Sequence, residues 1–242
     1  MRLSIVIPCY NEAESVSQMR AQLGRIHAEL ERRGPFELII VDDGSSDNTA
    51  DIIAAAFAGW QNLTIVRHKH NRGLGAALRT GFAHASGEIV ITTDSDGTYP
   101  FDTIPDLLDR LTPDIDIVTA SPYHPAGGVD GVPAYRLFFS QGASFLYRLL
   151  VNPHLHTYTA MYRAYRRKVI DHINTNANGF LMVTELMVGA LLAGYRVAEL
   201  PAVLRVRRYG QSKARVLQIT RSHLRFQSKV LLRRLNILPT GA

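Results

Sequence analysis

The chain has 242 residues, of which 46% are hydrophobic and 20% charged, and its formal net charge is +6. This composition provides enough apolar material for one large core and argues against disorder. The single cysteine, Cys9, excludes an intrachain disulfide and argues against a cysteine-based zinc site. The apolar stretches are too short or too charged to span a membrane, and the first residues lack a signal-peptide pattern. The excess of positive charge indicates an anionic partner.

Short β-branched runs alternate with helical patterns through the first half of the chain. Strands are predicted at 3–8, 36–41, 63–67, 88–93 and 116–120. Helices are predicted at 13–33, at 48–58, from just after Gly73 to about residue 85, and at 102–111. This alternation predicts an α/β fold with a mostly parallel sheet covered by helices on both faces.

The second half is less regular. Residues 122–133 are rich in glycine and proline and predict a mobile loop, followed by helices at 134–151 and 180–193. Residues 196–208 predict an extended segment, in which Pro201 indicates a sheet edge. A last helix is predicted at about 214–235. We therefore expect one domain over residues 1–213 and a basic, amphipathic helical tail over 214–242.

Polar residues follow three of the predicted strands: Tyr10-Asn11-Glu12, Asp42-Asp43-Gly44 and Asp94-Ser95-Asp96. Parallel strands end at the same edge of a sheet, so these side chains are expected to converge there. Asp94 and Asp96 can both reach one hard divalent cation, and Mg²⁺ commonly takes one or two carboxylates plus substrate phosphates. A lone carboxylate at a strand end is more often a turn or helix-cap residue, and for Asp42 and Asp47 this interpretation carries equal weight.

Four segments in this order resemble the family 2 glycosyltransferases of GT-A fold: SIVIPCYNE at 4–12, VDDGSSD at 41–47, NRGLG at 71–75 and TDSDG at 93–97. The resemblance implies that Asp94 and Asp96 hold Mg²⁺ or Mn²⁺. It also implies a nucleotide-diphosphate sugar of the GDP-mannose or UDP-glucose type as donor. The residues implied to bind this donor are Pro8, Tyr10, Asn11, Glu12, Asp42, Asp43, Gly73, Asp94, Ser95 and Asp96.

The second half resembles one subgroup of that family, the polyprenyl-phosphate sugar synthases of the dolichol-phosphate mannosyltransferase kind. The segment RRYGQSK at 207–213 is similar to their Arg-x-x-Gly-x-Ser-Lys, and Arg136 with Ser140 resembles their acceptor-phosphate site. The resemblance implies a lipid phosphate acceptor bound by Arg136, Ser140, Arg207, Ser212 and Lys213. The chain departs from the subgroup at three places: Thr98 replaces a glutamine, 121–123 replaces Gly-Ser-Arg, and 157–162 replaces Asp-x-x-Ser-Gly-Phe.

The reaction expected from this resemblance is inverting transfer of a hexose, mannose or glucose, to a polyprenyl phosphate. Its catalytic residues would be Asp94, Asp96, Arg136, Arg207 and Lys213. An acceptor phosphate is already an anionic nucleophile, so no general base is required. A sugar or polymer hydroxyl as acceptor would need a base, for which Glu185 and Asp130 are the candidates. A degenerate GT-A domain that only binds is a third hypothesis, against which the retained Asp94 and Asp96 argue.

The basic tail permits two interpretations. Its Arg and Lys residues alternate with apolar ones, which fits either a helix packed on the domain or a helix lying on an anionic membrane. No motif indicates nucleic-acid binding. We expect a cytoplasmic protein, peripheral at the cytoplasmic face of a membrane. His68-x-His70 and His154-x-His156 lack further ligands at zinc-like spacing, Gly73-x-Gly75 lacks the third glycine of a dinucleotide site, and Cys9 is expected to be a small buried apolar residue.

Overall fold

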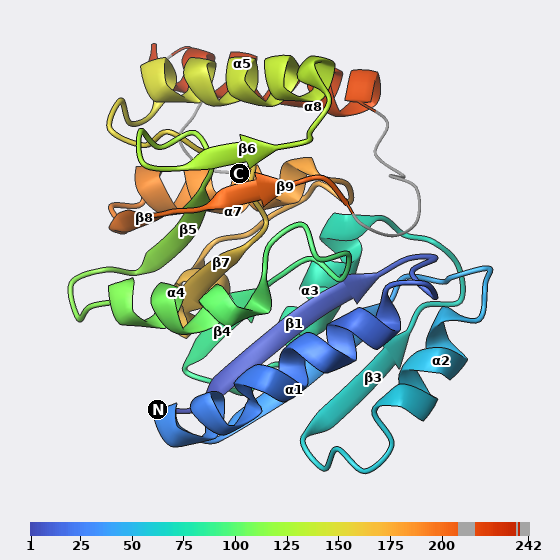
Figure 1. Cartoon of the computed structure of the whole chain (residues 1–242). Helices are drawn as coiled ribbons and strands as arrows, with labels where there is room; N and C mark the ends of the chain where they lie inside the picture. The colour runs from blue at the N-terminus through green and yellow to red at the C-terminus, as the bar shows by residue number, and fades with distance from the viewer. Residues whose placement is uncertain (208–215, 236, 238–242) are drawn as a thin grey trace.

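A seven-stranded sheet runs through the molecule in the order β3-β2-β1-β4-β7-β5-β8 (Figure 1). The computed structural model describes residues 1–207, 216–235 and 237. All pairings in this sheet are parallel except those of β7, which runs antiparallel to both β4 and β5. The strands are β1 (Leu3–Cys9), β2 (Phe36–Asp42), β3 (Leu63–Arg67), β4 (Ile89–Thr92), β5 (Ile117–Ser121), β7 (Arg163–Arg166) and β8 (Val197–Pro201). The predicted α/β fold with a mostly parallel sheet is confirmed.

Helices cover both faces of the sheet, which explains why its central strands read as continuous apolar runs. All seven residues of β1 are buried: Ile5 and Ile7 face one apolar cluster and Val6 the other. The first cluster lies under α1 (Val16–Arg33), α2 (Thr49–Ala56), the short 3₁₀ turn η1 (Phe101–Thr103) and α4 (Ile104–Arg110). The second lies under α3 (Leu74–His84), α6 (Arg167–His172) and α7 (Leu181–Leu192).

A third layer is formed by α5 (Ala134–Leu150) and α8 (Val216–Arg234), which pack side by side along one end of the molecule (Figure 1). A separate apolar cluster joins this pair to α7 through Tyr147 of α5, Val230 of α8 and Met187 of α7. Below α5 lies a small parallel sheet of β6 (Gly128–Asp130) and β9 (Val203–Arg205). The described part of the predicted tail is therefore a helix packed on the rest of the chain.

Three features of the second half differ from the prediction. The segment 122–133 contains the strand β6, and the extended segment 196–208 divides into β8 and β9, which belong to different sheets. Strand β7 and helix α6 were not predicted. The strand is hard to recognise because it begins with Arg163, a residue type that usually lies at the surface. Arg163 is nevertheless fully buried, and its guanidinium donates to Thr119 Oγ1 at 3.0 Å and to the carbonyls of Tyr158 and Val183. The expectation that Pro201 marks an edge is confirmed, since β8 is an outer strand.

Candidate active site

A cavity of about 1320 Å³ opens where the parallel strands end. The loops after β1, β2 and β4 contribute one side of it, as expected for a parallel α/β sheet. Helix α5, the segment after β9 and the first turns of α8 contribute the other side. It brings together most of the residues predicted for the site: Pro8, Tyr10, Glu12, Asp43, Gly73, Asp94, Ser95, Asp96, Arg136, Ser140 and Arg207.

Arg207 bridges two buried carboxylates at the centre of this cavity. Its Nε donates to Asp96 Oδ2 at 2.8 Å, and one terminal nitrogen donates to Glu12 Oε1 at 2.8 Å. The backbone holds this arrangement in place, because the Arg205 N–H donates to the Thr98 carbonyl at 3.2 Å, and the Thr98 N–H donates to Asp96 Oδ1 at 2.9 Å. The pairing of β9 with this loop thus places the guanidinium of Arg207, which follows β9, next to the acidic residues after β4.

The acidic cluster is electrostatically unfavourable without added positive charge. Burial and the neighbouring Asp96 carboxylate raise the pKa of Asp94 well above its usual range, against the opposing effect of Arg207. Burial also raises the pKa of Glu12, again opposed by Arg207. Closely spaced carboxylates that resist ionisation favour a bound cation.

The carboxylate oxygens at this site fit a divalent metal ion that a bound ligand also coordinates. Within residues 1–207, 216–235 and 237, no group of three or more His, Cys, Asp or Glu side chains is placed to hold a metal by itself. Asp94 and Asp96 supply only carboxylate oxygens, which Mg²⁺ and Mn²⁺ accept, and the remaining positions would go to phosphate oxygens and water. The two aspartates therefore fit a metal that enters with an anionic ligand.

Asp43 organises the loop after β3. Its carboxylate accepts the N–H groups of Arg72 and Gly73 at 2.9 and 2.8 Å and the Asn71 amide at 3.0 Å, and it lies 2.6 Å from His68 Nδ1. Gly73 has a φ of +93°, and a Cβ there would lie 2.4 Å from the carbonyl oxygen of Asn178. Asp43 thus fixes residues 71–73, and Gly73 lets this loop approach the Asn178 backbone, so that together they shape this wall of the cavity.

Two of the residues predicted to bind the donor, Asp42 and Asn11, do not line the cavity. Asp42 is fully buried; its Oδ1 accepts the Ser45 N–H at 3.1 Å, and its Oδ2 lies 3.1 Å from Arg67 Nε. Asn11, with a φ of +53°, accepts the Ser46 N–H at 2.8 Å. Both residues tie loops together, which is the turn-residue interpretation that the sequence left open for Asp42.

Arg136 and Ser140 lie one helical turn apart on α5 and line the cavity beyond the acidic cluster. Ser140 Oγ is 2.7 Å from Thr159 Oγ1, and Arg136 Nε donates to the Tyr135 hydroxyl at 3.2 Å. Ser212 and Lys213, also predicted for this site, lie outside the described residues. Sequence reasoning missed the lining residues Gln218, Ile219 and Ser222 of α8, whose ordinary polar and apolar types give no signal.

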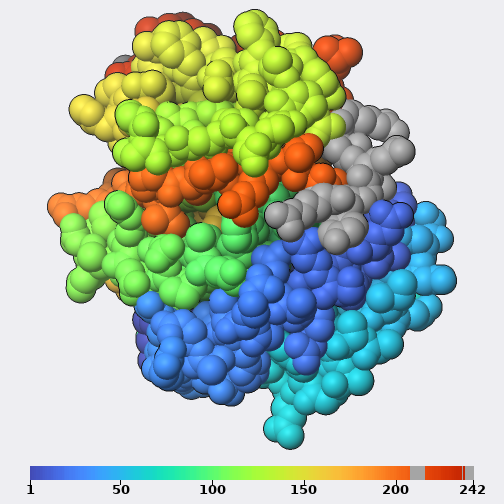
Figure 2. Space-filling model, viewed as in Figure 1, coloured from blue at the N-terminus to red at the C-terminus, as the bar shows by residue number. Residues whose placement is uncertain are grey.

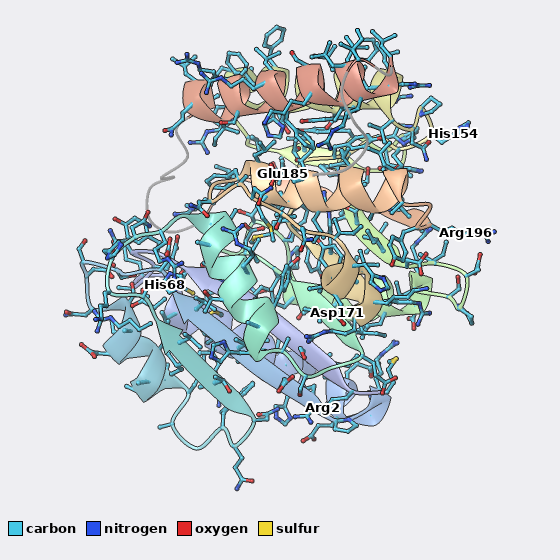
Figure 3. The ribbon with its side chains drawn as sticks, turned by 180° about the vertical axis from the view of Figure 1, so that it is seen from behind. Arg2, His68, His154, Asp171, Glu185 and Arg196 are labelled. Atoms are coloured by element: carbon cyan, nitrogen blue, oxygen red, sulfur yellow. The ribbon has the colours of Figure 1, made fainter. Side chains whose placement is uncertain are left out.

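The two candidate bases for a hydroxyl acceptor stand elsewhere. Glu185 accepts the backbone N–H groups of Asn176 and Ala177 at 3.1 and 2.8 Å, and it projects from α7 (Figure 3). Asp130 is exposed on β6. Neither is among the described residues that line the cavity.

One histidine of each pair, His68 and His156, has structural side-chain contacts, and the cysteine is buried. His68 and His154 lie on different sides of the molecule (Figure 3). His68 is buried and contacts Asp43 and Thr80, and His156 Nδ1 is 2.7 Å from Glu199 Oε2. Cys9 is buried, as predicted, and burial raises the pKa of its thiol.

The amino-acid sequence is similar to those of known glycosyltransferases. The model of the family described as glycosyl transferase family 2 matches residues 4–173. Polyprenol monophosphomannose synthase from Mycolicibacterium smegmatis is 31% identical, over 88% of this chain and 80% of the relative. Dolichol-phosphate mannosyltransferase from Pyrococcus furiosus is 28% identical, over 88% of this chain but only 59% of the relative's length.

A solved structure shares the fold. Glucosyl-3-phosphoglycerate synthase from Mycobacterium tuberculosis, crystallised with Mn²⁺, uridine diphosphate and glucosyl-3-phosphoglycerate, superposes with a TM-score of 0.68. The match covers 99% of this chain and 82% of the synthase at 21% identity. The same synthase has also been crystallised with Mg²⁺ and uridine diphosphate. At this identity the likeness establishes a common GT-A architecture.

Proposed function

The chain belongs to glycosyl transferase family 2, and on that basis we propose that it transfers a hexose from a nucleotide-diphosphate sugar to a polyprenyl phosphate. The observation that carries the proposal is one continuous cavity with two chemically different ends. The acidic pair Asp94 and Asp96 lines it from the loop after β4, which we call the acidic end, and the Arg136–Ser140 pair lines it from α5, which we call the basic end. The two relatives described above, whose names specify polyprenyl or dolichyl phosphate, support this choice of acceptor.

The acidic end suits the donor. Asp94 and Asp96 would hold Mg²⁺ or Mn²⁺, and the ion would supply positive charge to the departing diphosphate when bound. The resemblance implied Arg207 for the acceptor phosphate. Because it contacts the Asp96 and Glu12 carboxylates, we propose that it also stabilises phosphate oxygens of the donor through charge-assisted hydrogen bonds. Asp43 and Gly73 shape the wall next to this cluster. We propose GDP-mannose or UDP-glucose as the class of donor.

The basic end suits an anionic acceptor. Arg136 can contact a phosphate through two nitrogens, and the Ser140 hydroxyl can donate a further hydrogen bond. A phosphate oxygen attacks the anomeric carbon, and the bond from that carbon to the diphosphate oxygen breaks with both of its electrons leaving on the diphosphate. In-line displacement inverts the anomeric centre. The phosphate needs no general base, which agrees with the positions of Glu185 and Asp130 outside the cavity.

We also propose that the chain works peripherally at the cytoplasmic face of a membrane. None of the described helices is both long and apolar enough to cross a bilayer. The layer of α5 and α8 exposes large apolar side chains beside basic ones, which suits an anionic leaflet. The exposed apolar residues of this layer include Tyr135, Leu149, Leu217, Leu224 and Leu231.

Transfer of label tests the proposed reaction. Purified protein is incubated with radiolabelled GDP-mannose or UDP-glucose, undecaprenyl phosphate in detergent, and Mg²⁺ or Mn²⁺. We expect label in the organic phase as an acid-labile product. Label that remains on a water-soluble or polymeric hydroxyl acceptor would contradict the lipid phosphate and favour the hydroxyl-transfer hypothesis.

Arg136 provides a sharper test within the same assay. Arg136→Ala should raise the acceptor KM about tenfold or more, because a charge-assisted phosphate contact is lost, while the donor KM changes little. Arg196→Ala is the matched control, since Arg196 is an exposed arginine near the outer strand β8 (Figure 3).

A further inference from the structure

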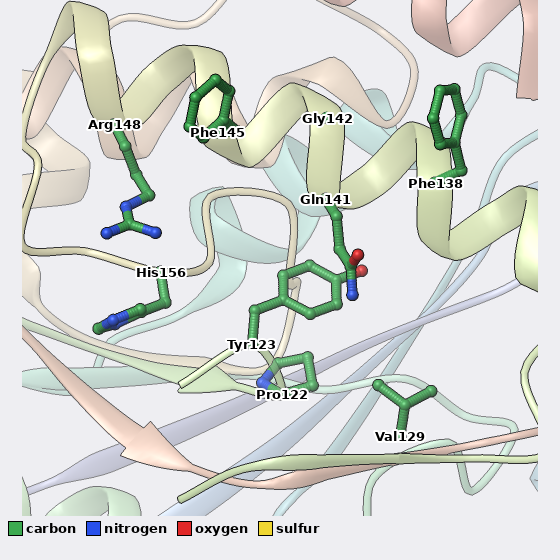
Figure 4. Close-up of a pocket in the computed structure, with 9 residues that line it drawn as sticks. All are labelled: Pro122, Tyr123, Val129, Phe138, Gln141, Gly142, Phe145, Arg148 and His156. Atoms are coloured by element: carbon green, nitrogen blue, oxygen red, sulfur yellow. The ribbon is translucent and has the colours of Figure 1, made fainter. Parts of the chain in front are cut away.

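A second cavity, of about 600 Å³, lies between α5 and residues 122–129 (Figure 4). Its walls are mainly apolar and aromatic, formed by Pro122, Tyr123, Val129, Phe138 and Phe145. Arg148 and His156 stand together at one end (Figure 4). We call this cavity the α5 groove. Neither the family resemblance nor the proposed reaction assigns it a role.

The α5 groove adjoins the active-site cavity through Tyr123. This residue lines both spaces. On α5, Arg136 and Ser140 face the active-site cavity, whereas Phe138 and Phe145 lie roughly 140–180° further around the helix and line the groove from nearly the opposite face. A molecule whose phosphate lies at Ser140 therefore has an apolar surface directly beyond Tyr123.

The wall opposite α5 includes Pro122 and Tyr123, from one segment in which this chain departs from the subgroup pattern, and Thr157, from another such segment, holds it from behind. Ser121 Oγ lies 2.8 Å from Thr157 Oγ1, and the Tyr123 N–H donates to the same Thr157 oxygen at 3.4 Å. Tyr123 itself stands where the subgroup carries an arginine. The two departures thus contact each other, and Tyr123 gives this wall an aromatic surface.

The groove also carries apolar surface that nothing within the described chain covers. Phe138 is 74% exposed and Phe145 is 57% exposed, high values for phenylalanines on a helix that packs against the rest of the molecule. Between them stands Gly142, at which an added Cβ would meet no atom within 4 Å. Figure 2 shows α5 on the outside of the molecule, above β6 and β9.

We propose that the α5 groove binds the apolar chain of the acceptor next to its phosphate; this inference rests on the proposed function. From Phe138 to Phe145 the helix rises about 10 Å, which leaves room for only the first isoprene units. Arg148 and His156 end the apolar stretch, so a longer chain must leave over the outer face of α5. Tyr123 then stands between the phosphate of the acceptor and its isoprenoid chain, and it helps to select an acceptor with an apolar tail.

The test compares a groove-filling variant with a matched control. Gly142→Leu fills the groove and also raises helix propensity, so misfolding does not explain a loss. Ser228→Leu adds the same side chain to the exposed face of α8, outside the groove. Equilibrium dialysis measures binding of radiolabelled farnesyl phosphate and isopentenyl phosphate, and rate assays measure transfer to both compounds.

We expect the preference for farnesyl over isopentenyl phosphate, as a ratio of affinities and of kcat/KM values, to fall at least tenfold in Gly142→Leu and to stay unchanged in Ser228→Leu. An unchanged ratio in Gly142→Leu would overturn the inference. A loss of phospholipid-vesicle binding in place of chain discrimination would also overturn it, because the groove would then serve membrane docking.

The dialysis result distinguishes this inference from the proposed function. If the wild-type protein prefers farnesyl phosphate in dialysis, and Gly142→Leu removes that preference, the groove assignment stands even when no sugar is transferred. In that case the proposed reaction fails alone. If sugar is transferred but no chain preference exists in dialysis or rate assays, the reaction stands and the groove assignment fails.

Discussion

The two halves of the chain build the two ends of the active-site cavity by different means. In residues 1–121, the acidic end is set by strand register, since parallel β1, β2 and β4 deliver their polar ends to one edge. In the second half, the basic end depends on side-chain packing of α5 against α8 and α7. Backbone hydrogen bonds between strands are little affected by substitutions of exposed side chains. The packing of two helices, in contrast, is sensitive to the substitution of a single buried side chain. The following predictions test this contrast in order of decreasing effect.

The largest effect is expected at the end of β4. Asp96→Ala removes a carboxylate from the donor end and one partner of Arg207, so turnover should fall about 10³-fold or more, equivalent to about 4 kcal/mol of transition-state stabilisation. Initial rates with saturating Mn²⁺ measure this loss. Asp102→Ala, at an exposed aspartate paired with Arg25, should keep wild-type rates. Full activity in Asp96→Ala would remove the metal assignment.

The second effect concerns docking of α8. His223 is buried against Tyr147 of α5, with 3.1 Å between Tyr147 Oη and His223 Nδ1, and burial lowers the pKa of His223 to about 4. Between pH 6.5 and 4, His223 is protonated in the unfolded chain but remains neutral in the folded one. The free energy of unfolding therefore decreases as the pH falls through this range, by about 3 kcal/mol in total.

Urea unfolding at pH 7 and pH 4.5 measures this effect. His223→Gln should lose less stability between these pH values than the wild type, and His154→Gln, at an exposed histidine, should behave as the wild type does. An identical pH dependence in His223→Gln would show that the α5–α8 layer does not carry the acid sensitivity.

The third effect returns to the first half. Gly73→Ala forces a φ of +93° on alanine and places its Cβ against the Asn178 backbone, so we expect a loss of about 2–3 kcal/mol in unfolding free energy. Gly59 has a similar φ of +88° but open space around it, so Gly59→Ala should cost about 1 kcal/mol. Equal losses in the two variants would show that the contact with Asn178 contributes nothing.

The smallest effect is a gain. Gly142→Ala on α5 meets no neighbouring atom and should stabilise the protein by about 0.5–1 kcal/mol, because alanine loses less backbone entropy in a helix. Thermal unfolding of the ligand-free protein measures the shift, with Ser228→Ala on α8 as a control for alanine at an exposed helical site. A decrease in stability would indicate that the groove is narrower than described.

The acidic end could be predicted from the sequence because its determinants are local. Each strand is a short apolar run followed at once by polar residues, and this pattern alone is enough to place Asp94, Asp96 and Glu12 at one edge of the sheet. The family resemblance then suggested Arg136 and Ser140, which the structure places in the same cavity.

What the sequence could not provide depends on contacts between distant segments. Arg207 pairs with Glu12 and Asp96, and no periodicity connects β9 with the loops after β1 and β4. The buried Arg163 looks like a surface residue until its acceptors are seen. Asp42 and Asp43 are adjacent and of one type, yet only Asp43 faces the cavity, because β2 ends between them.

The antiparallel strand β7 also has a consequence for biosynthesis. Both strands that pair with β5, namely β7 and β8, follow it in the chain. A ribosome-bound chain that ends shortly after β5 can pair β1 to β4 with one another, but the outer edge of β4 stays open until residues 163–166 emerge. We expect an early, partly folded species with an exposed strand edge, in which aggregation competes with completion of the sheet.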